Sequence, residues 1–122
     1  MSIEPGLESS RDFEVEGMLL TDVGGSIGNK VLSTPGMIGM MEYTSSRMVL
    51  PHLDDGQATV GFEVHVKHVA AAREGTQCTV RSRLEEVVDG RKLRFSVEVT
   101  AEDGRTIGVG THERRVISPR GE

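Results

Sequence analysis

The sequence predicts an α+β fold in which an antiparallel sheet of about five strands wraps around one long central helix. Apolar and polar residues alternate through most of the chain after residue 56, which is typical of half-buried strands. Asp-Gly pairs, which favour tight hairpins, separate the later alternating stretches at 89–90 and 103–104. One segment, 34–50, is instead apolar nearly all round, as expected for a helix that other elements enclose.

The first strand is expected over residues 12–20, where Phe13, Val15 and Leu19 fall on one face. Residues 22–33 follow, with three glycines and no strong period. This composition is typical of a mobile loop between the strand and the helix.

The helix is expected to begin at Thr34, whose hydroxyl can cap its first turn. Pro35 suits the first helical position, where the backbone amide has no partner in any case, and the helix ends near Pro51. Mostly small residues form a stripe along it and would let another backbone approach closely. The stripe consists of Gly36, Gly39, Tyr43 and Ser46.

Four further strands are expected after the helix, in a largely antiparallel meander with a longer connection at 69–75. One helix covers most of one face of such a sheet, which leaves its edges and its second face available for a partner subunit. These strands are expected over residues 57–68, 76–88, 91–101 and 105–117.

The composition indicates one cytoplasmic domain. The chain has 122 residues, 36% hydrophobic and 27% charged, and its net charge of −5 without a basic run argues against nucleic-acid binding. Cys78 is the single cysteine, so neither an internal disulfide nor a cysteine cluster for zinc is expected. The acidic start lacks the apolar core of a signal peptide, and no stretch reaches the roughly 18 apolar residues of a membrane span. We expect a single domain over residues 1–122, with flexible ends at about 1–10 and 119–122.

Two histidines stand three residues apart in the strand expected at 57–68. Residues i and i+3 of a strand point to opposite faces, so His65 and His68 are not expected to share a metal ion, and no metal site is predicted. Alternation groups His65 with Gly61 and His68 with Phe62. His68 is then either a satisfied histidine at the edge of the core or a general base in a cleft with an apolar wall.

Glu42 is the only charged residue in the middle of the predicted helix. A glutamate is rarely buried without a partner, so either this helix face is exposed to solvent or Glu42 pairs with another group. At the helix start, a capping role is sufficient to explain Thr34. The backbone amides around Gly36 and Met37 could also orient a carbonyl group or stabilise an oxyanion.

Three parts of the sequence resemble a known family. They are the run from Thr34 to Glu42, the placement of Gly61 seven residues before His68, and the segment GVGTHERRVI at 108–117. Together they resemble the fluoroacetyl-CoA thioesterase-like branch of the hot dog proteins, over most of the chain.

The resemblance implies a hot dog fold and a homodimer with active sites at the subunit interface, while pairing into tetramers stays open. It implies a catalytic constellation of Thr34, Glu42 and His68, with Gly61 near the thioester carbonyl. CoA enters only as part of the substrate, and no separate cofactor is expected. Gly28 stands where the fluoroacetyl-specific member has an aromatic lid residue, which leaves the acyl group open.

The implied reaction is hydrolysis of a short or medium acyl-CoA to the free acid and CoA. Glu42 would activate water or attack directly, His68 would serve as general base and acid, and Thr34 would orient the reacting group. A non-catalytic acyl-CoA-binding or sensing dimer is the alternative, since fold does not dictate function. A hydratase ranks last, because no aspartate closely precedes His68. Side chains that could contact the CoA phosphates are Lys67, Arg73, Arg114 and Arg115.

Overall fold

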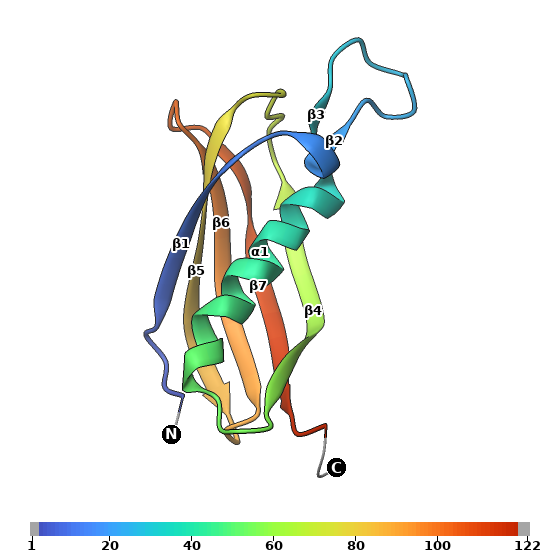
Figure 1. Cartoon of the computed structure of the whole chain (residues 1–122). Coiled ribbons are helices and arrows are strands. Elements are labelled where there is room, and N and C mark those ends of the chain that lie inside the picture. The colour runs from blue at the N-terminus through green and yellow to red at the C-terminus, as the bar shows by residue number, and fades with distance from the viewer. Residues whose placement is uncertain (1–2, 120–122) are drawn as a thin grey trace.

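The computed structural model describes residues 3–119 and contains a five-stranded antiparallel sheet packed against one helix (Figure 1). The predicted α+β architecture is therefore confirmed. The spatial order of the strands is β1-β5-β6-β7-β4. Their bounds are Glu8–Glu14 for β1, Ala58–His68 for β4, Gln77–Val88 for β5, Lys92–Ala101 for β6 and Thr106–Ile117 for β7. Of the predicted flexible ends, residues 1–2 and 120–122 lie outside the described residues.

The helix α1 spans Thr34–Val49, crosses one face of the sheet, and continues as the 3₁₀ turn η2 at Leu50–His52 (Figure 1). Its N-cap is Ser33 rather than the predicted Thr34, because Ser33 Oγ accepts a hydrogen bond of 2.9 Å from the amide of Gly36. The Thr34 hydroxyl is therefore not used in capping and can bond elsewhere.

The hydrophobic core lies between α1 and the sheet. Met37 and Met41 of the helix pack with Leu84, Leu93 and Phe95 of the sheet, and each of these side chains is at most 1% exposed. Burying a side chain of this size contributes about 1.5–3 kcal/mol, so this layer supplies much of the stability that fixes the helix on the sheet.

The order of the strands differs from the predicted meander at one point. β5, β6 and β7 follow one another as expected, but β4 pairs with β7 and not with β5. The connection at 69–75 is long enough to cross the end of the sheet, where backbone hydrogen bonds tie it to Leu32 and Ile107. Sequence alternation identifies strands but does not say which neighbour each one pairs with.

The start of the chain also differs from the prediction. β1 begins at Glu8 and ends at Glu14, so residues 8–10 pair with β5 and are not part of a flexible end. Gly17, with φ of +56°, then turns the chain into a short 3₁₀ turn, η1 (Gly17–Leu19). The predicted loop at 22–33 is bounded by a two-stranded ribbon of β2 (Leu20–Thr21) and β3 (Val31–Leu32), which projects from the body of the molecule (Figure 1).

A β-bulge in β4 changes which of its side chains share a face. The register with β7 shifts between Gly61 and Glu63, which leaves Phe62 as the extra residue. The alternation reverses across the bulge, so Gly61 and His68 both face α1. The prediction that they lie on opposite faces is wrong, because strict alternation holds only for a regular strand.

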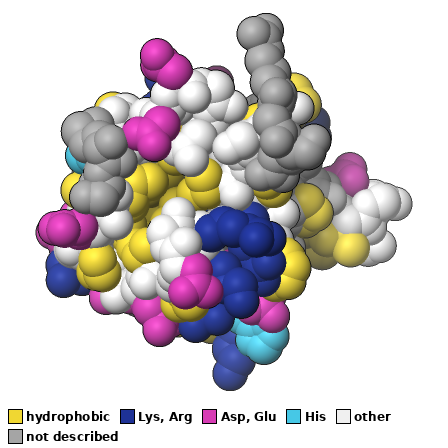
Figure 2. Space-filling model, turned by 90° about the horizontal axis from the view of Figure 1, so that it is seen from below, with side chains coloured by type: hydrophobic (Ala, Val, Ile, Leu, Met, Phe, Trp, Pro, Cys, Tyr) yellow, Lys and Arg dark blue, Asp and Glu magenta, His cyan; other side chains and the backbone are white. Residues whose placement is uncertain are grey.

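Basic side chains gather at the end of the molecule where β6 begins and β7 ends, next to an apolar area (Figure 2). Arg91 precedes β6, and Lys92 lies opposite Arg115 in the β6–β7 register. A cluster of positive charge thus lies at this end of a chain whose net charge is −5.

None of the helices within residues 3–119 is long and apolar enough to cross a membrane.

Candidate active site

Thr34 and His68 meet where α1 begins and β4 ends. Thr34 Oγ1 lies 2.8 Å from His68 Nδ1, within hydrogen-bond distance. Because Ser33 caps the helix, the Thr34 hydroxyl is available for this bond. The fold therefore brings together two of the three residues that the family resemblance implicates.

The surroundings of His68 favour its neutral ring. Burial lowers the pKa of His68 below its ordinary value near 6.5, and the backbone of Ala70 opposes part of this shift. The second ring nitrogen, Nε2, is buried and has no hydrogen-bond partner within residues 3–119. A neutral imidazole with one nitrogen on Thr34 and the other unpaired can take up and deliver a proton near neutral pH.

Glu42 lies over Gly61, farther along both α1 and β4. A Cβ atom on residue 61 would lie 2.6 Å from Glu42 Oε2, closer than such atoms approach, so the missing side chain of Gly61 makes room for the carboxylate. Glu42 Oε2 also lies 3.8 Å from Nη1 of Arg114. The Glu42 side chain is 39% exposed and that of Arg114 only 9%, so a buried cation faces a carboxylate that remains open to a ligand.

Arg114 is held in place by its other contacts. Its Nε donates to Thr59 Oγ1 at 2.9 Å and its Nη2 donates to the Thr59 carbonyl at 3.0 Å. Nη1 lies 3.3 Å from Nε2 of His112. Arg114 was expected among the surface contacts of CoA phosphates, but this burial assigns it to the Glu42 site instead.

The two pairs of site residues remain separate within one chain. Thr34 and Glu42 are eight residues apart, which corresponds to about 12 Å along the helix axis. Across the described part of the chain, no hydrogen bond or ion pair joins Glu42 to Thr34 or His68. Both pairs nevertheless lie on the helix-facing side of β4.

The amides predicted to orient a carbonyl are already occupied. The Gly36 amide donates to Ser33 Oγ at 2.9 Å, and the Met37 amide donates to the Ser33 carbonyl at 2.9 Å. The Met37 side chain is fully buried in the core. The substrate-binding role expected for Gly36 and Met37 is therefore not supported by this geometry, because the helix cap uses both donors.

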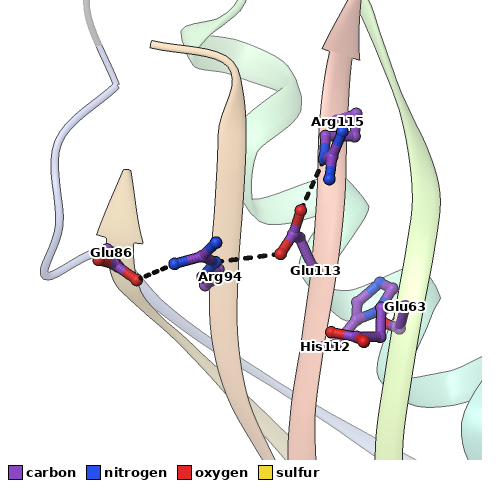
Figure 3. Close-up of polar contacts among 6 residues, drawn as sticks. All are labelled: Glu63, Glu86, Arg94, His112, Glu113 and Arg115. Atoms are coloured by element: carbon purple, nitrogen blue, oxygen red, sulfur yellow. Dashed lines mark hydrogen bonds and ion pairs between the residues drawn. The ribbon is translucent and has the colours of Figure 1, made fainter. Parts of the chain in front are cut away.

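Arg115 belongs to a ladder of ion pairs on the outer face of the sheet (Figure 3). Glu86 pairs with Arg94 at 2.7 Å, Arg94 with Glu113 at 3.0 Å, and Glu113 with Arg115 at 2.6 Å. The guanidinium of Arg115 also lies 3.6 Å above the ring centroid of Phe62. These contacts engage Arg115, which makes it a weaker candidate for a CoA phosphate contact than the sequence suggested.

Lys67 and Arg73 are both exposed and remain candidates for contacts with the CoA phosphates. Within residues 3–119, no cluster of three or more His, Cys, Asp or Glu residues could hold a metal ion.

Comparisons with known proteins identify the family of the chain. The sequence pattern of the family described as fluoroacetyl-CoA-specific thioesterase matches residues 15–120. A fluoroacetyl-CoA thioesterase of Streptantibioticus cattleyicolor is 42% identical over 89 residues, which cover 72% of this chain and 62% of that protein. The matched region thus spans less than two thirds of this curated relative.

Solved structures extend the similarity to nearly the whole chain. The fluoroacetyl-CoA thioesterase FlK superposes with a TM-score of 0.87 at 28% identity, covering 98% of this chain and 92% of that one. A thioesterase superfamily member of Thermus thermophilus superposes with a TM-score of 0.85 at 28% identity, covering 97% and 86%. Variants of FlK have been solved with acetyl-CoA, and with fluoroacetate and CoA. On this evidence the fold is a hot dog fold, and the chain belongs to the fluoroacetyl-CoA-specific thioesterase family of the hot dog thioesterase superfamily.

Proposed function

We propose that the protein hydrolyses a short or medium acyl-CoA thioester to the free acid and CoA. The observation that carries the proposal is the placement of the Glu42 carboxylate over Gly61, on the side of β4 to which His68 also points. A carboxylate, a neutral imidazole and a hydroxyl group suffice for acyl transfer to water, because a thiolate is a good leaving group.

In the proposed reaction the thioester carbonyl lies beside Gly61. Glu42 takes a proton from water as the water oxygen bonds to the carbonyl carbon, or attacks that carbon itself to give an anhydride that water then cleaves. The C–S bond breaks, and the CoA sulfur leaves as a thiolate. Where Glu42 attacks directly, neutral His68 takes a proton from the water that cleaves the anhydride and can pass this proton to the thiolate. Thr34, hydrogen-bonded to His68 Nδ1, orients the imidazole for this transfer.

The acyl group is proposed from what the chain shares with FlK and from what it lacks. FlK variants bind acetyl-CoA, fluoroacetate and CoA, which supports a CoA ester as substrate for this chain. The loop between β2 and β3 carries the exposed apolar residues Val23 and Ile27 but no aromatic residue. A loop without a bulky ring gives no reason to expect selectivity for fluoroacetyl over other short acyl groups.

We further propose that the working form is a homodimer that joins along β4. Within residues 3–119, β4 pairs only with β7, so its other edge offers unpaired backbone groups to a second copy. Val60 and Phe62, 44% and 57% exposed, lie on this edge strand. A second copy placed there would bring its residues toward the gap between the Thr34–His68 and Glu42–Gly61 pairs. The cytoplasm remains the expected location, which the free, buried Cys78 supports.

The test is steady-state release of free thiol from a panel of acyl-CoAs, from acetyl to decanoyl with one aromatic ester, using Glu42→Ala as the control. We expect turnover of the shorter esters that disappears in the variant. Tight binding of CoA esters without turnover by the unaltered protein would instead favour the non-catalytic binding function.

A further inference from the structure

His112 lies next to the proposed site, and the resemblance assigns it no role. The residue is 2% exposed, and its ring stacks on Phe95 with ring centroids 5.9 Å apart and an interplanar angle of 25°. His112 Nδ1 lies 2.8 Å from the carbonyl oxygen of Glu63 across the β4–β7 ladder, and Figure 3 shows the ring beside Glu63. The two neighbouring strands, β4 and β6, thus hold the buried His112 ring in place.

The contacts of His112 determine where its proton lies. A carbonyl oxygen only accepts hydrogen bonds, so Nδ1 must carry the proton that it donates to Glu63. Burial lowers the pKa of His112; the bond to Glu63 opposes this shift, the charge of Arg114 adds to it, and the charge of Glu42 opposes it. In the neutral ring, Nε2 is then unprotonated and accepts from Arg114 Nη1 at 3.3 Å.

All three nitrogens of the Arg114 guanidinium are thereby fixed. Nε and Nη2 donate to Thr59, and Nη1 donates to Nε2 of His112. Nη1 is also the nitrogen that lies 3.8 Å from Glu42 Oε2. Because the guanidinium is a rigid planar fork, fixing these contacts fixes the direction in which Nη1 presents its charge. Arg114 and Glu42 are the charged side chains that act on the His112 ring.

We propose that His112 is a positioning residue: as the neutral tautomer protonated on Nδ1, it orients Arg114, which in turn holds the Glu42 carboxylate over Gly61. The catalytic consequence rests on the proposed thioester hydrolysis, whereas the tautomer and the arrangement of the three side chains do not. A protonated His112 would have no acceptor for Arg114 and would place a second cation beside it, so the arrangement requires the neutral ring.

The first arm of the test is independent of activity. Nitrogen-15 NMR of the imidazoles at pH 7.5 is expected to show His112 with a protonated Nδ1 and an unprotonated Nε2. The carbon-13 signal of the Glu42 carboxylate is expected to move in His112→Phe and to stay in place in His65→Gln, a change of an exposed histidine on the opposite face. A ring protonated on Nε2, or a Glu42 signal that is unaffected by His112→Phe, would overturn the proposal even if the protein were not a thioesterase.

The second arm uses thiol release. His112→Phe keeps a planar ring but cannot accept from Arg114, and we expect kcat to fall about tenfold or more with KM within about threefold. His112→Gln, whose side-chain oxygen can accept from Arg114, is expected to recover most of the loss.

In a Glu42→Gln background, His112→Phe should change the residual kcat by less than about twofold, because the residue acts through Glu42. Equal losses in the Phe and Gln variants, or additive losses in the double variant, would show a merely structural role. If His112→Phe fails to fold, the Gln variant and the NMR tautomer still decide the question.

Discussion

At the scale of single residues, Gly61 tests how closely the Glu42 carboxylate must sit against β4. In Gly61→Ala the new methyl group would meet Glu42 Oε2 at 2.6 Å and displace the carboxylate. We expect kcat/KM for acyl-CoA hydrolysis to fall at least tenfold, because a displacement of this kind disturbs a positioned catalytic group. Stability should hold or rise, since the φ of Gly61 lies outside the left-handed region and alanine suits a strand better than glycine.

Gly39→Ala is the matched control for this change. Gly39 is exposed on α1, and a Cβ there would meet no atom within 4 Å. Activity should stay within about twofold, and the helix should gain about 0.5–1 kcal/mol. Equal activity losses in the two alanine variants would contradict a specific role for Gly61.

His68 and His112, whose pKa values are both lowered, predict a pH dependence of stability. Burial lowers the pKa of His68 and of His112 below 6.5, so at pH values between the lowered pKa and 6.5 the unfolded chain binds more protons than the folded chain. The free energy of unfolding should therefore fall as pH drops below about 6.5, by at most about 1.4 kcal/mol per pH unit for each histidine, and should not change from this source above that pH. Thermal unfolding between pH 5 and 8 measures this slope. His68→Gln and His112→Gln should each reduce this slope; slopes that stay unchanged in both variants would refute the assignment.

The sequence could indicate some site residues and not others. Thr34, Glu42 and His68 stand out by chemical type, as a hydroxyl at a helix start, a lone charge in an apolar helix and a histidine ending an apolar strand. Arg114 and His112 do not stand out in the sequence, because a run of charged residues usually lies on the solvated surface. The signal that could have found them is the β6–β7 register, which places His112 opposite Phe95 and Arg114 opposite the fully buried Leu93.

At the scale of secondary-structure elements, two adjacent residues at the start of α1 are expected to have different roles, one in stability and one in catalysis. Ser33→Ala removes the cap and should cost about 1 kcal/mol of stability, with activity at 25 °C within about threefold of the unaltered protein. Thr34→Val keeps the cap but removes the hydrogen bond to His68, so it should lower kcat/KM about tenfold or more with a smaller effect on stability. Chemical unfolding and thiol release on both variants measure these effects. Loss of activity in Ser33→Ala together with loss of stability in Thr34→Val would contradict this division of roles.

The bulge in β4 explains why alternation failed at the site. Alternation predicts faces correctly on β6, where Leu93, Phe95, Val97 and Val99 are all buried. In β4 the extra residue Phe62 reverses the phase, and this reversal lets both Gly61 and His68 face α1. A bulge is a property of the pairing between two strands, so a single strand read by itself does not reveal it.

At the scale of the whole molecule, the exposed edge of β4 predicts self-association. Sedimentation velocity at micromolar concentration should show a dimer, and Val60→Lys should weaken it at least tenfold and lower the activity with it, because a charge on an edge strand opposes pairing. Val109→Lys is the matched control, since Val109 is 42% exposed but lies on β7, inside the sheet. A fully active monomer would contradict the dimer proposal.

The overall architecture was accessible from the sequence because it depends on local patterns. One apolar helix and the Asp-Gly turns at 89–90 and 103–104 define most of the elements. The position of β4 beside β7 and the short β2–β3 ribbon depend on contacts between residues far apart in the chain, such as the bond from Leu32 to the Ala72 carbonyl. Local periodicity carries no information about such contacts.

The most direct test of the account compares the unaltered protein with Glu42→Gln in thiol release from its best acyl-CoA. Glu98→Gln, an exposed change on the outer face of β6, serves as the control. We expect kcat/KM to fall about 100-fold or more in Glu42→Gln alone, with unfolding temperature and dimerisation unchanged, because loss of a positioned acid–base group normally costs this much. If Glu42→Gln retains kcat/KM within about threefold of the unaltered protein, Glu42 is not the catalytic carboxylate and the proposed mechanism is wrong.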